Sequence, residues 1–185
     1  MVNRRLLVGK EISLEDLPKI LFETEVGKLM ERMYALFGRR QRSEKEVKDY
    51  LRNLSFKRKI KDKEELSDVV IEAVIETLKR KGMVNDAQFA QSWVEARRKS
   101  KKKGLNALKS ELYQKGIARN VIEETLEGQT SESEEKLAKE ALEKKMRVWK
   151  NLEKLEFKKK ALEFLVRRGF SYDVAKDVVD SFLIK

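Results

Sequence analysis

Apolar residues recur every three or four positions along most of the chain, a pattern that predicts amphipathic helices rather than strands. Several of these stripes end in a basic residue and a glycine, as at Gly116 and Gly169, which are common helix-ending signals. One motif, a leucine followed by a basic helix end and an aromatic or branched residue, occurs three times. It starts at Leu51, Leu112 and Leu165, which lie 61 and 53 residues apart. Such spacings fit units of three short helices.

We therefore predict an all-α fold of three tandem three-helix repeats that form an elongated, curved array. The predicted divisions are an N-terminal segment at 1–27, repeat 1 at 28–85, repeat 2 at 86–128 and repeat 3 at 129–185. Residues 128–133 are the clearest linker, at which the repeats are expected to flex. Capping residues predict helix starts at Ser43 with Glu46, Asp86, Ser131 with Glu134, and Ser171.

Repeat 1 departs from the other two in two ways. Ser55 stands where they have a glycine, so its helix end is expected to be looser or shaped differently. Residues 57–67 are a charged insertion with almost no apolar residue, which either lengthens a helix or forms a loop.

Composition excludes several kinds of site. Of the 185 residues, 41% are hydrophobic and 41% are charged, and neither cysteine nor histidine occurs, which excludes disulfides and Cys or His metal sites. The pairs of Ser43 with Glu46 and Ser131 with Glu134 are better explained as helix caps than as catalytic groups. We expect no enzyme activity, no cofactor and no metal. No apolar run is long enough to span a membrane, and the start lacks a secretory apolar core, so the expected location is cytoplasmic, without a membrane partner.

The net charge of +11 is concentrated in clusters of cations that no acid interrupts. Six cations within seven positions repel one another by a few tenths of a kcal/mol per helical pair, which calls for an anionic partner. Such clusters predict weak, salt-dependent binding to nucleic acid. Residues 158–160 fall within a helix and are better explained as solvated lysines. The main contact candidates are Arg97, Arg98, Lys99, Lys101, Lys102 and Lys103, and the secondary candidates are Arg39, Arg40, Arg42, Arg167 and Arg168.

Several segments, taken in order and with their spacing, resemble the RecX family of regulators over about residues 28–182. The segment at Arg5–Ser13 also looks like the part that precedes the first repeat in longer members. The segments that carry the resemblance are Arg40-Gln41-Arg42-Ser43, Asn85-Asp86-Ala87-Gln88-Phe89-Ala90 with Trp93 and Arg97, Glu111-Leu112 with Lys115-Gly116-Ile117, and Arg167-Arg168-Gly169-Phe170-Ser171.

The resemblance implies three tandem three-helix repeats without enzymatic chemistry. It implies that the partner is the RecA recombinase filament on single-stranded DNA. Members of the family bind in the groove of that filament and typically inhibit its ATPase, strand-exchange and coprotease activities. We therefore expect a negative modulator of RecA that is a monomer, and we expect the cation clusters to contact the filament or its DNA.

Two other functions remain open from the sequence. A general DNA- or RNA-binding helical module without RecA specificity would also explain the basic excess. However, the most basic run lies at a helix end, and no set of Asn, Gln or Arg is spaced along a recognition helix. A magnesium-dependent nuclease that uses Asp and Glu is the third hypothesis, which metal-dependent DNA cleavage by the purified protein would support.

Overall fold

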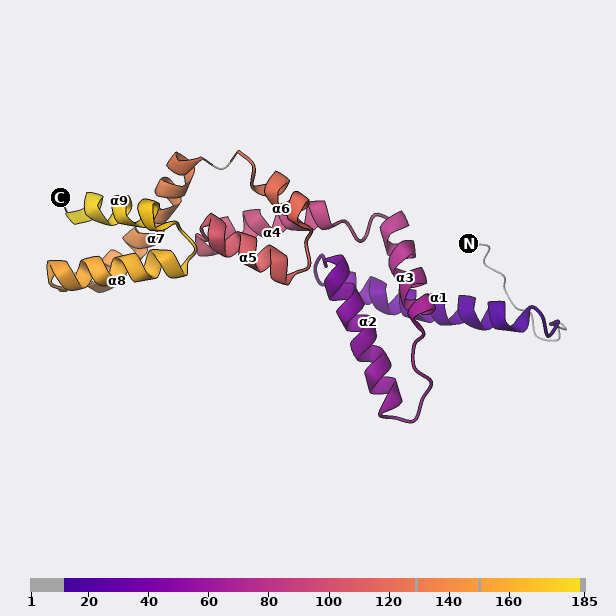
Figure 1. The fold of residues 1–185 in the computed structure, drawn as a ribbon. Coiled ribbons are helices and arrows are strands. Elements are labelled where there is room, and N and C mark those ends of the chain that lie inside the picture. The colour runs from indigo at the N-terminus through magenta and orange to yellow at the C-terminus, as the bar shows by residue number, and fades with distance from the viewer. Residues whose placement is uncertain (1–11, 129, 150, 184–185) are drawn as a thin grey trace. The chain divides into compact units, whose positions relative to one another are not determined.

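All regular secondary structure in the described residues, 12–128, 130–149 and 151–183 of the computed structural model, is helical (Figure 1). This confirms the predicted all-α class. The resemblance of Arg5–Ser13 to an upstream segment falls mostly outside the described residues. In order, the helices are α1 (Leu17–Phe37), α2 (Glu44–Lys59), α3 (Asp68–Arg80), α4 (Asp86–Lys101), α5 (Leu105–Gln114), α6 (Arg119–Leu126), α7 (Ser131–Trp149), α8 (Lys154–Arg167) and α9 (Tyr172–Leu183).

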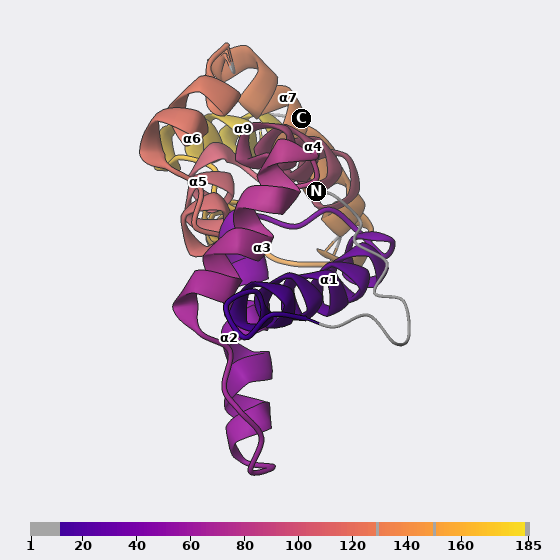
Figure 2. The same cartoon turned by 90° about the vertical axis from the view of Figure 1, so that its right-hand side faces the viewer.

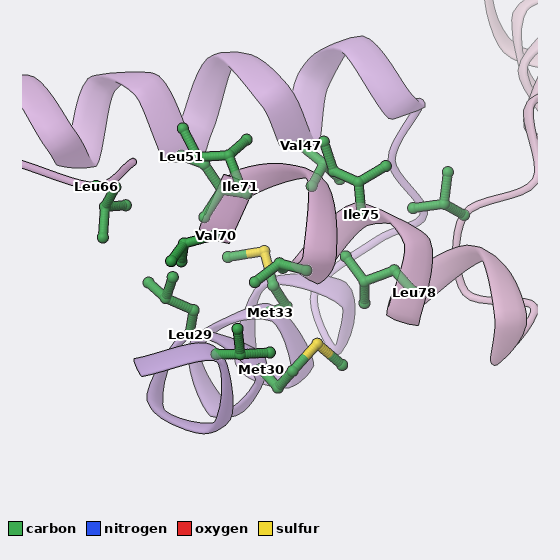
Figure 3. Packing of buried hydrophobic residues seen from close by; sticks show 13 residues of the cluster. Leu29, Met30, Met33, Val47, Leu51, Leu66, Val70, Ile71, Ile75 and Leu78 are labelled. Atoms are coloured by element: carbon green, nitrogen blue, oxygen red, sulfur yellow. The ribbon is translucent and has the colours of Figure 1, made fainter. Parts of the chain in front are cut away.

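The helices form three successive triplets, and each triplet has its own hydrophobic core. In the triplet α1–α3, side chains of all three helices are buried in one cluster. Figure 3 shows Leu29 and Met33 of α1, Leu51 of α2, and Ile71 and Ile75 of α3 directed toward one another. The apolar stripes therefore predict which face of each helix is buried.

The cores of the other two triplets have different compositions. In α4–α6 the core contains Phe89, Leu108 and Leu112, with Trp93 packed against it. In α7–α9 it is richer in alanine and aromatic residues, and the Trp149 ring makes T-shaped contacts with the rings of Phe157 and Phe164. The divisions at 1–27, 28–85, 86–128 and 129–185 stay predictions, although α1 already begins at Leu17 and Val26 belongs to its core.

Two of the predicted helix starts are confirmed. The hydroxyl of Ser43 accepts a hydrogen bond from the backbone N–H of Glu46 at 3.2 Å. The hydroxyl of Ser171 accepts one from the N–H of Val174 at 3.3 Å. Each of these bonds satisfies a donor that the first turn of a helix leaves open.

The other two predicted caps are wrong. Asn85, not Asp86, caps α4, because its side chain accepts from the N–H of Gln88 at 3.0 Å. At α7 the hydroxyl of Thr130 accepts from the N–H of Ser133 at 3.2 Å, so the predicted pair of Ser131 with Glu134 does not form the cap. Asp86 and Glu134 instead bind the second helix of the preceding repeat, as described below.

Ser55 lies within α2, which continues to Lys59 before the chain turns back toward α3. Its side chain is buried, and its hydroxyl accepts a hydrogen bond from the N–H of Leu66 at 2.9 Å. Residues 57–67 therefore extend the helix and then form a loop. A serine fits here because the helix does not end and the hydroxyl anchors the returning loop.

The chain divides into two compact units. The first contains the residues up to Arg42 and Val47–Val84; the second contains Ser43–Glu46 and Asn85–Lys185. The first turn of α2 therefore belongs to the second unit. The second helices of the three triplets are α2, α5 and α8. This unit contains two junctions between them: at the first, the start of α2 meets the end of α5, and at the second, the start of α5 meets the end of α8.

The two junctions use equivalent contacts. At the first, the hydroxyl of Ser43 donates to the carbonyl of Lys115 at 2.7 Å. At the second, the N–H of Gly104 donates to the carbonyl of Arg168 at 2.9 Å, and the N–H of Asn106 donates to the carbonyl of Gly169 at 3.0 Å. At both junctions, donors at the start of one helix (α2 or α5) bind backbone carbonyls at the end of another (α5 or α8), which have no partner within their own helix.

A carboxylate from the following first helix completes each junction. Asp86 of α4 accepts a hydrogen bond from the N–H of Glu44, the first residue of α2, at 2.9 Å. Glu134 of α7 accepts one from the N–H of Leu105, the first residue of α5, at 3.1 Å. These two acids were predicted as local caps, and they cap the start of a neighbouring helix instead.

Glycine is required at the end of α5 and of α8 for two reasons. Gly116 and Gly169 have φ angles of 79° and 92°, in the left-handed region that glycine favours. A Cβ on Gly116 would lie 2.5 Å from the Cβ of Lys45, and one on Gly169 would lie 2.3 Å from the Cβ of Ala107. No side chain fits between the helix end and the helix start that docks on it.

We predict that Gly169→Ala destabilises the protein more than Gly82→Ala, measured by urea unfolding followed by circular dichroism. Gly82 has a φ of 68° but no atom within 4 Å of an added Cβ, so its substitution carries only backbone strain. That strain is about 1–2 kcal/mol. At Gly169 the steric overlap with Ala107 adds about 1–3 kcal/mol. Equal losses at the two positions would contradict the required close approach.

Candidate nucleic-acid interface

The main cation run lies at the end of α4 and in the connection to α5. Arg98, Lys99 and Lys101 occupy the last turn, where the helix dipole favours cations. The chain then turns at Lys102, whose φ of 49° is left-handed. After this turn, the side chains of Lys102 and Lys103 point toward different helices, α7 and α5.

Arg97 and Lys103 both bind Glu111 of α5. The Nε atom of Arg97 lies 2.9 Å from one carboxylate oxygen, and the Nζ atom of Lys103 lies 3.3 Å from the other. The indole N–H of Trp93 donates to the same carboxylate at 2.8 Å, and the guanidinium of Arg97 stacks 4.2 Å from the centre of the Trp93 ring. These contacts tie α4 to α5 through two ion pairs, the hydrogen bond from Trp93 and a cation–π interaction.

Arg98 and Lys102 reach across the second junction to α7. Arg98 donates to Glu134 at 2.6 Å, and their side chains are only 16% and 6% exposed. Lys102 binds Glu140 at 2.5 Å. The hydrogen bond from Lys102 holds the pKa of Glu140 below its ordinary value. Glu134 thus joins the Arg98 side chain to the capped start of α5.

Three acids of the same chain supply the anionic partner that the cation run called for. Repulsion within the run therefore does not by itself require an external anion at Arg97, Arg98, Lys102 or Lys103. The sequence alone does not assign Glu134 and Glu140 to these cations, because each lies more than 30 residues from the cation it binds. Contact of these four cations with an outside partner stays a prediction.

Lys99 and Lys101 are exposed, as is Arg167 at the end of α8. The guanidinium of Arg168 donates to the backbone carbonyl of Lys101 and stacks 4.5 Å from the centre of the Phe164 ring. Burial lowers the pKa of Arg168 from its ordinary value. The structure therefore brings two predicted clusters, one on α4 and one on α8, next to each other.

The third predicted cluster lies in the first unit, between α1 and α2. Arg39 and Arg40 are exposed, Arg42 is partly buried, and Arg40 donates to the carbonyl of Gln41 at 3.0 Å. Arg40 and Arg42 stand three and one positions before the first junction residue, Ser43. Lys101 and Lys103 stand at the same offsets before Gly104.

A second pair of equivalent cations precedes the two junction glycines. Arg168 precedes Gly169, and Lys115 precedes Gly116 in the same way. Lys115 binds Glu46 at 2.5 Å and lies 5.0 Å from the centre of the Trp93 ring. Lys115 is not among the contact candidates predicted from the sequence. Its position before Gly116, equivalent to that of Arg168 before Gly169, is the sequence signal that identifies it.

Such an arrangement suits the binding of anionic groups. Cations at equivalent places in successive repeats present positive charge to phosphates or carboxylates without fixing their identity. Among the described residues, no acids gather as a group that could hold a metal ion. None of the described helices combines the length and apolar character needed to cross a membrane.

Comparison with known protein families matches both later triplets. The family model for "RecX, second three-helix domain" matches residues 85–126, and that for "RecX, third three-helix domain" matches residues 132–179. The regulatory protein RecX of Bacillus subtilis (strain 168) is 34% identical over 97% of this chain. That of Listeria innocua serovar 6a is 28% identical over 95% of it. The chain spans 64% and 62% of the lengths of these two relatives.

Solved structures agree with the fold. A crystal structure of regulatory protein RecX has a TM-score of 0.72 and 25% identity, and the match covers 95% of this chain and 82% of that one. The crystal structure of RecX from Lactobacillus salivarius has the same TM-score with 23% identity, and covers 88% of this chain and 99% of that one. The helical triplets are therefore shared with solved proteins.

A third family model, the NAD-binding domain of 3-hydroxyacyl-CoA dehydrogenase, matches residues 5–95, but the structure disagrees with it. Dinucleotide-binding domains need a parallel sheet and closely spaced glycines that cradle the phosphates. Residues 12–95 contain helices and no strand. The glycines in the matched segment, Gly9, Gly27, Gly38 and Gly82, are far apart.

We predict that Arg98→Ala lowers the free energy of unfolding by about 3 kcal/mol, because it leaves the nearly buried Glu134 carboxylate without its cation. Lys99→Ala, at the exposed neighbouring position, should change it by less than about 0.5 kcal/mol. Urea unfolding of both variants measures the difference. A loss at Arg98 no greater than that at Lys99 would show that the pair does not hold the junction.

Proposed function

Because the chain belongs to the RecX family, whose curated members are named regulatory proteins, we propose that it is a negative modulator of the RecA recombinase. It binds in the groove of RecA filaments on single-stranded DNA and inhibits their ATPase, strand-exchange and coprotease activities. Cations at equivalent offsets before Ser43 and Gly104 carry this proposal, because a filament presents the same surface again and again along its axis.

The regulatory role agrees with the chemistry of the described residues. The relatives carry the name of a regulator and not of an enzyme, which agrees with the prediction that the protein does not catalyse a reaction. The pair of Ser43 and Glu46 and the acid Glu134 are used in helix capping and ion pairs. The protein therefore acts by binding, and RecA filaments are the partner that the family implies.

Within the proposed interface, the exposed cations contact the filament or its DNA. Lys99, Lys101 and Arg167 lie near one another at the second junction and have exposed side chains. Arg39 and Arg40 are the exposed counterparts before α2. Arg97, Arg98, Lys102 and Lys103 hold the junction geometry through Glu111, Glu134 and Glu140, and contribute positive potential from their partly buried positions.

The same exposed cations favour a second candidate function, a general DNA- or RNA-binding module without RecA specificity. This candidate requires that the purified protein shift a nucleic acid at moderate salt and leave RecA unaffected. The two functions are therefore separated by an assay in which the protein does not bind naked DNA.

We predict that titration of the protein into RecA on single-stranded DNA inhibits ATP hydrolysis, at a salt concentration where the protein does not bind naked DNA. Hydrolysis of ATP is the direct measurement. Inhibition well below one molecule per RecA subunit would favour end blocking or disassembly over passive filling of the groove. An unchanged rate at saturation would reject the RecA proposal and favour the general nucleic-acid-binding module.

The charge-reversed variant K99E/K101E/R167E should need about tenfold more protein for the same inhibition, since three favourable charge contacts become repulsive. The matched control is K154E/K159E/K176E, which changes the net charge equally at exposed lysines of α8 and α9. Circular dichroism checks that both variants keep their helices. Equal inhibition by the two variants would remove Lys99, Lys101 and Arg167 from the interface.

A further inference from the structure

The charged insertion at 57–67 builds a cleft in the first unit that the proposed function does not use. In Figures 1 and 2, the last turns of α2 and the loop after them project beyond α1. Backbone hydrogen bonds fix this loop: the N–H of Ile60 donates to Phe56 at 3.1 Å and that of Lys63 to Arg58 at 3.1 Å. The loop, the end of α2 and one side of α1 enclose a cleft of about 560 Å³.

The cleft has an excess of positive charge. Its lining contains Arg58, which is paired with Glu25 at 2.6 Å, and one further acid, Glu64. Four more cations line it, and the described residues supply no ion-pair partner to any of them. These are Arg32, Lys57, Lys61 and Lys63, all with exposed side chains. In contrast to the run at the end of α4, this set lacks a matching set of acids.

A second, smaller cleft adjoins the first. Its lining contains the apolar residues Leu21, Phe22, Leu66 and Val70 and the acids Glu25, Glu64 and Glu65. It has a volume of about 280 Å³ and shares Glu25, Arg58 and Glu64 with the larger cleft, so the ion pair of Arg58 and Glu25 lies at their boundary. Leu21 and Phe22 of α1 line it, and the Leu21 side chain is 61% exposed. Together the two clefts offer an apolar end beside Leu21 and a cationic end beside Lys61.

We propose that these adjoining clefts bind an acidic protein segment that carries an apolar side chain at one end. The carboxylates would lie among the four unpaired cations, which attract them through partly screened charge interactions. The apolar side chain would cover Leu21 and Phe22, where burial of apolar surface favours binding. This docking site lies in the first unit and is separate from the cations proposed to contact RecA filaments.

Charge and lining select this occupant over two others. Single-stranded nucleic acid usually stacks its bases on aromatic side chains, and the larger cleft has no aromatic residue in its lining. Phe22 of the smaller cleft is partly buried and packs against the core of the first unit, so it is not a free stacking surface. The first residues of this chain carry Arg4, Arg5 and Lys10 against the single acid Glu11, so their charge matches that of the cleft and does not complement it. An acidic segment complements the charge of the larger cleft, where five cations face two acids. The smaller cleft, lined by three acids and one cation, suits the apolar side chain of that segment and not its carboxylates.

The proposal can be tested by fluorescence anisotropy with a labelled synthetic peptide. The peptide begins with a leucine and a phenylalanine and continues with alternating aspartates and glutamates. We expect the full chain to bind it in a salt-dependent manner and K61E/K63E to weaken binding about tenfold or more. The matched control, K159E/K176E, reverses two exposed lysines of α8 and α9 and should weaken it less than about threefold. Similar losses in both pairs, or no binding by the natural chain at low salt, would overturn the site.

The apolar end has its own matched pair. Leu21→Ser should lower the affinity for the peptide by about threefold to tenfold, since it removes one partly covered apolar contact. Leu155→Ser alters a residue that is 84% exposed on α8 and should leave binding unchanged. Equal effects of these two substitutions would reject the apolar end of the proposed site.

A labelled oligothymidine of similar length is the competing probe. If it binds more tightly than the peptide and loses affinity in K61E/K63E, the cleft belongs to nucleic acid and the proposal is wrong. The assay contains no RecA, so its result is independent of the ATPase measurement. Loss of peptide binding with intact RecA inhibition would reject this docking site alone.

Discussion

The close approach of a glycine at one helix end to the first turn of another helix is the constraint on which the second unit depends. Gly116 and Gly169 leave no space for a side chain against Lys45 and Ala107. Because of this approach, carbonyls at the end of one second helix meet donors at the start of another. Each triplet is too small to bury much apolar surface alone, so such junctions join small cores into one stable unit.

A carboxylate from the neighbouring first helix secures each junction electrostatically. Glu134 accepts the first N–H of α5 and also binds Arg98, so one buried group satisfies a helix start and a cation. The basic run at the end of α4 consequently has two roles. Its partly buried members hold α5 and α7 in place, and Lys99 and Lys101 face the solvent. The fold brings Glu111, Glu134 and Glu140 close to this run, which offsets the repulsion among its cations.

The first unit lacks this constraint at the position of Ser55, and its structure there differs accordingly. Without a glycine, α2 continues past Ser55, and the serine hydroxyl holds the returning loop at Leu66. The extension is highly charged, and it lines a cleft in place of the tight helix end found at Gly116 and Gly169. The serine in place of glycine and the insertion after it therefore give the first unit a charged cleft that has no counterpart at Gly116 and Gly169.

The helices, their buried faces and the repetition of the unit can be predicted from the amino-acid sequence, because they depend on apolar spacing and local end signals. Leu51, Leu112 and Leu165 are each fully buried, as their positions in the stripes predict. The basic clusters were also readable, because they are consecutive. The caps at Asp86 and Glu134 could not be assigned locally, since these acids bind helix starts that precede them by 42 and 29 residues. Which cations are paired within the chain and which remain exposed follows from the folded structure alone, because an ion pair depends on distance in space rather than along the sequence.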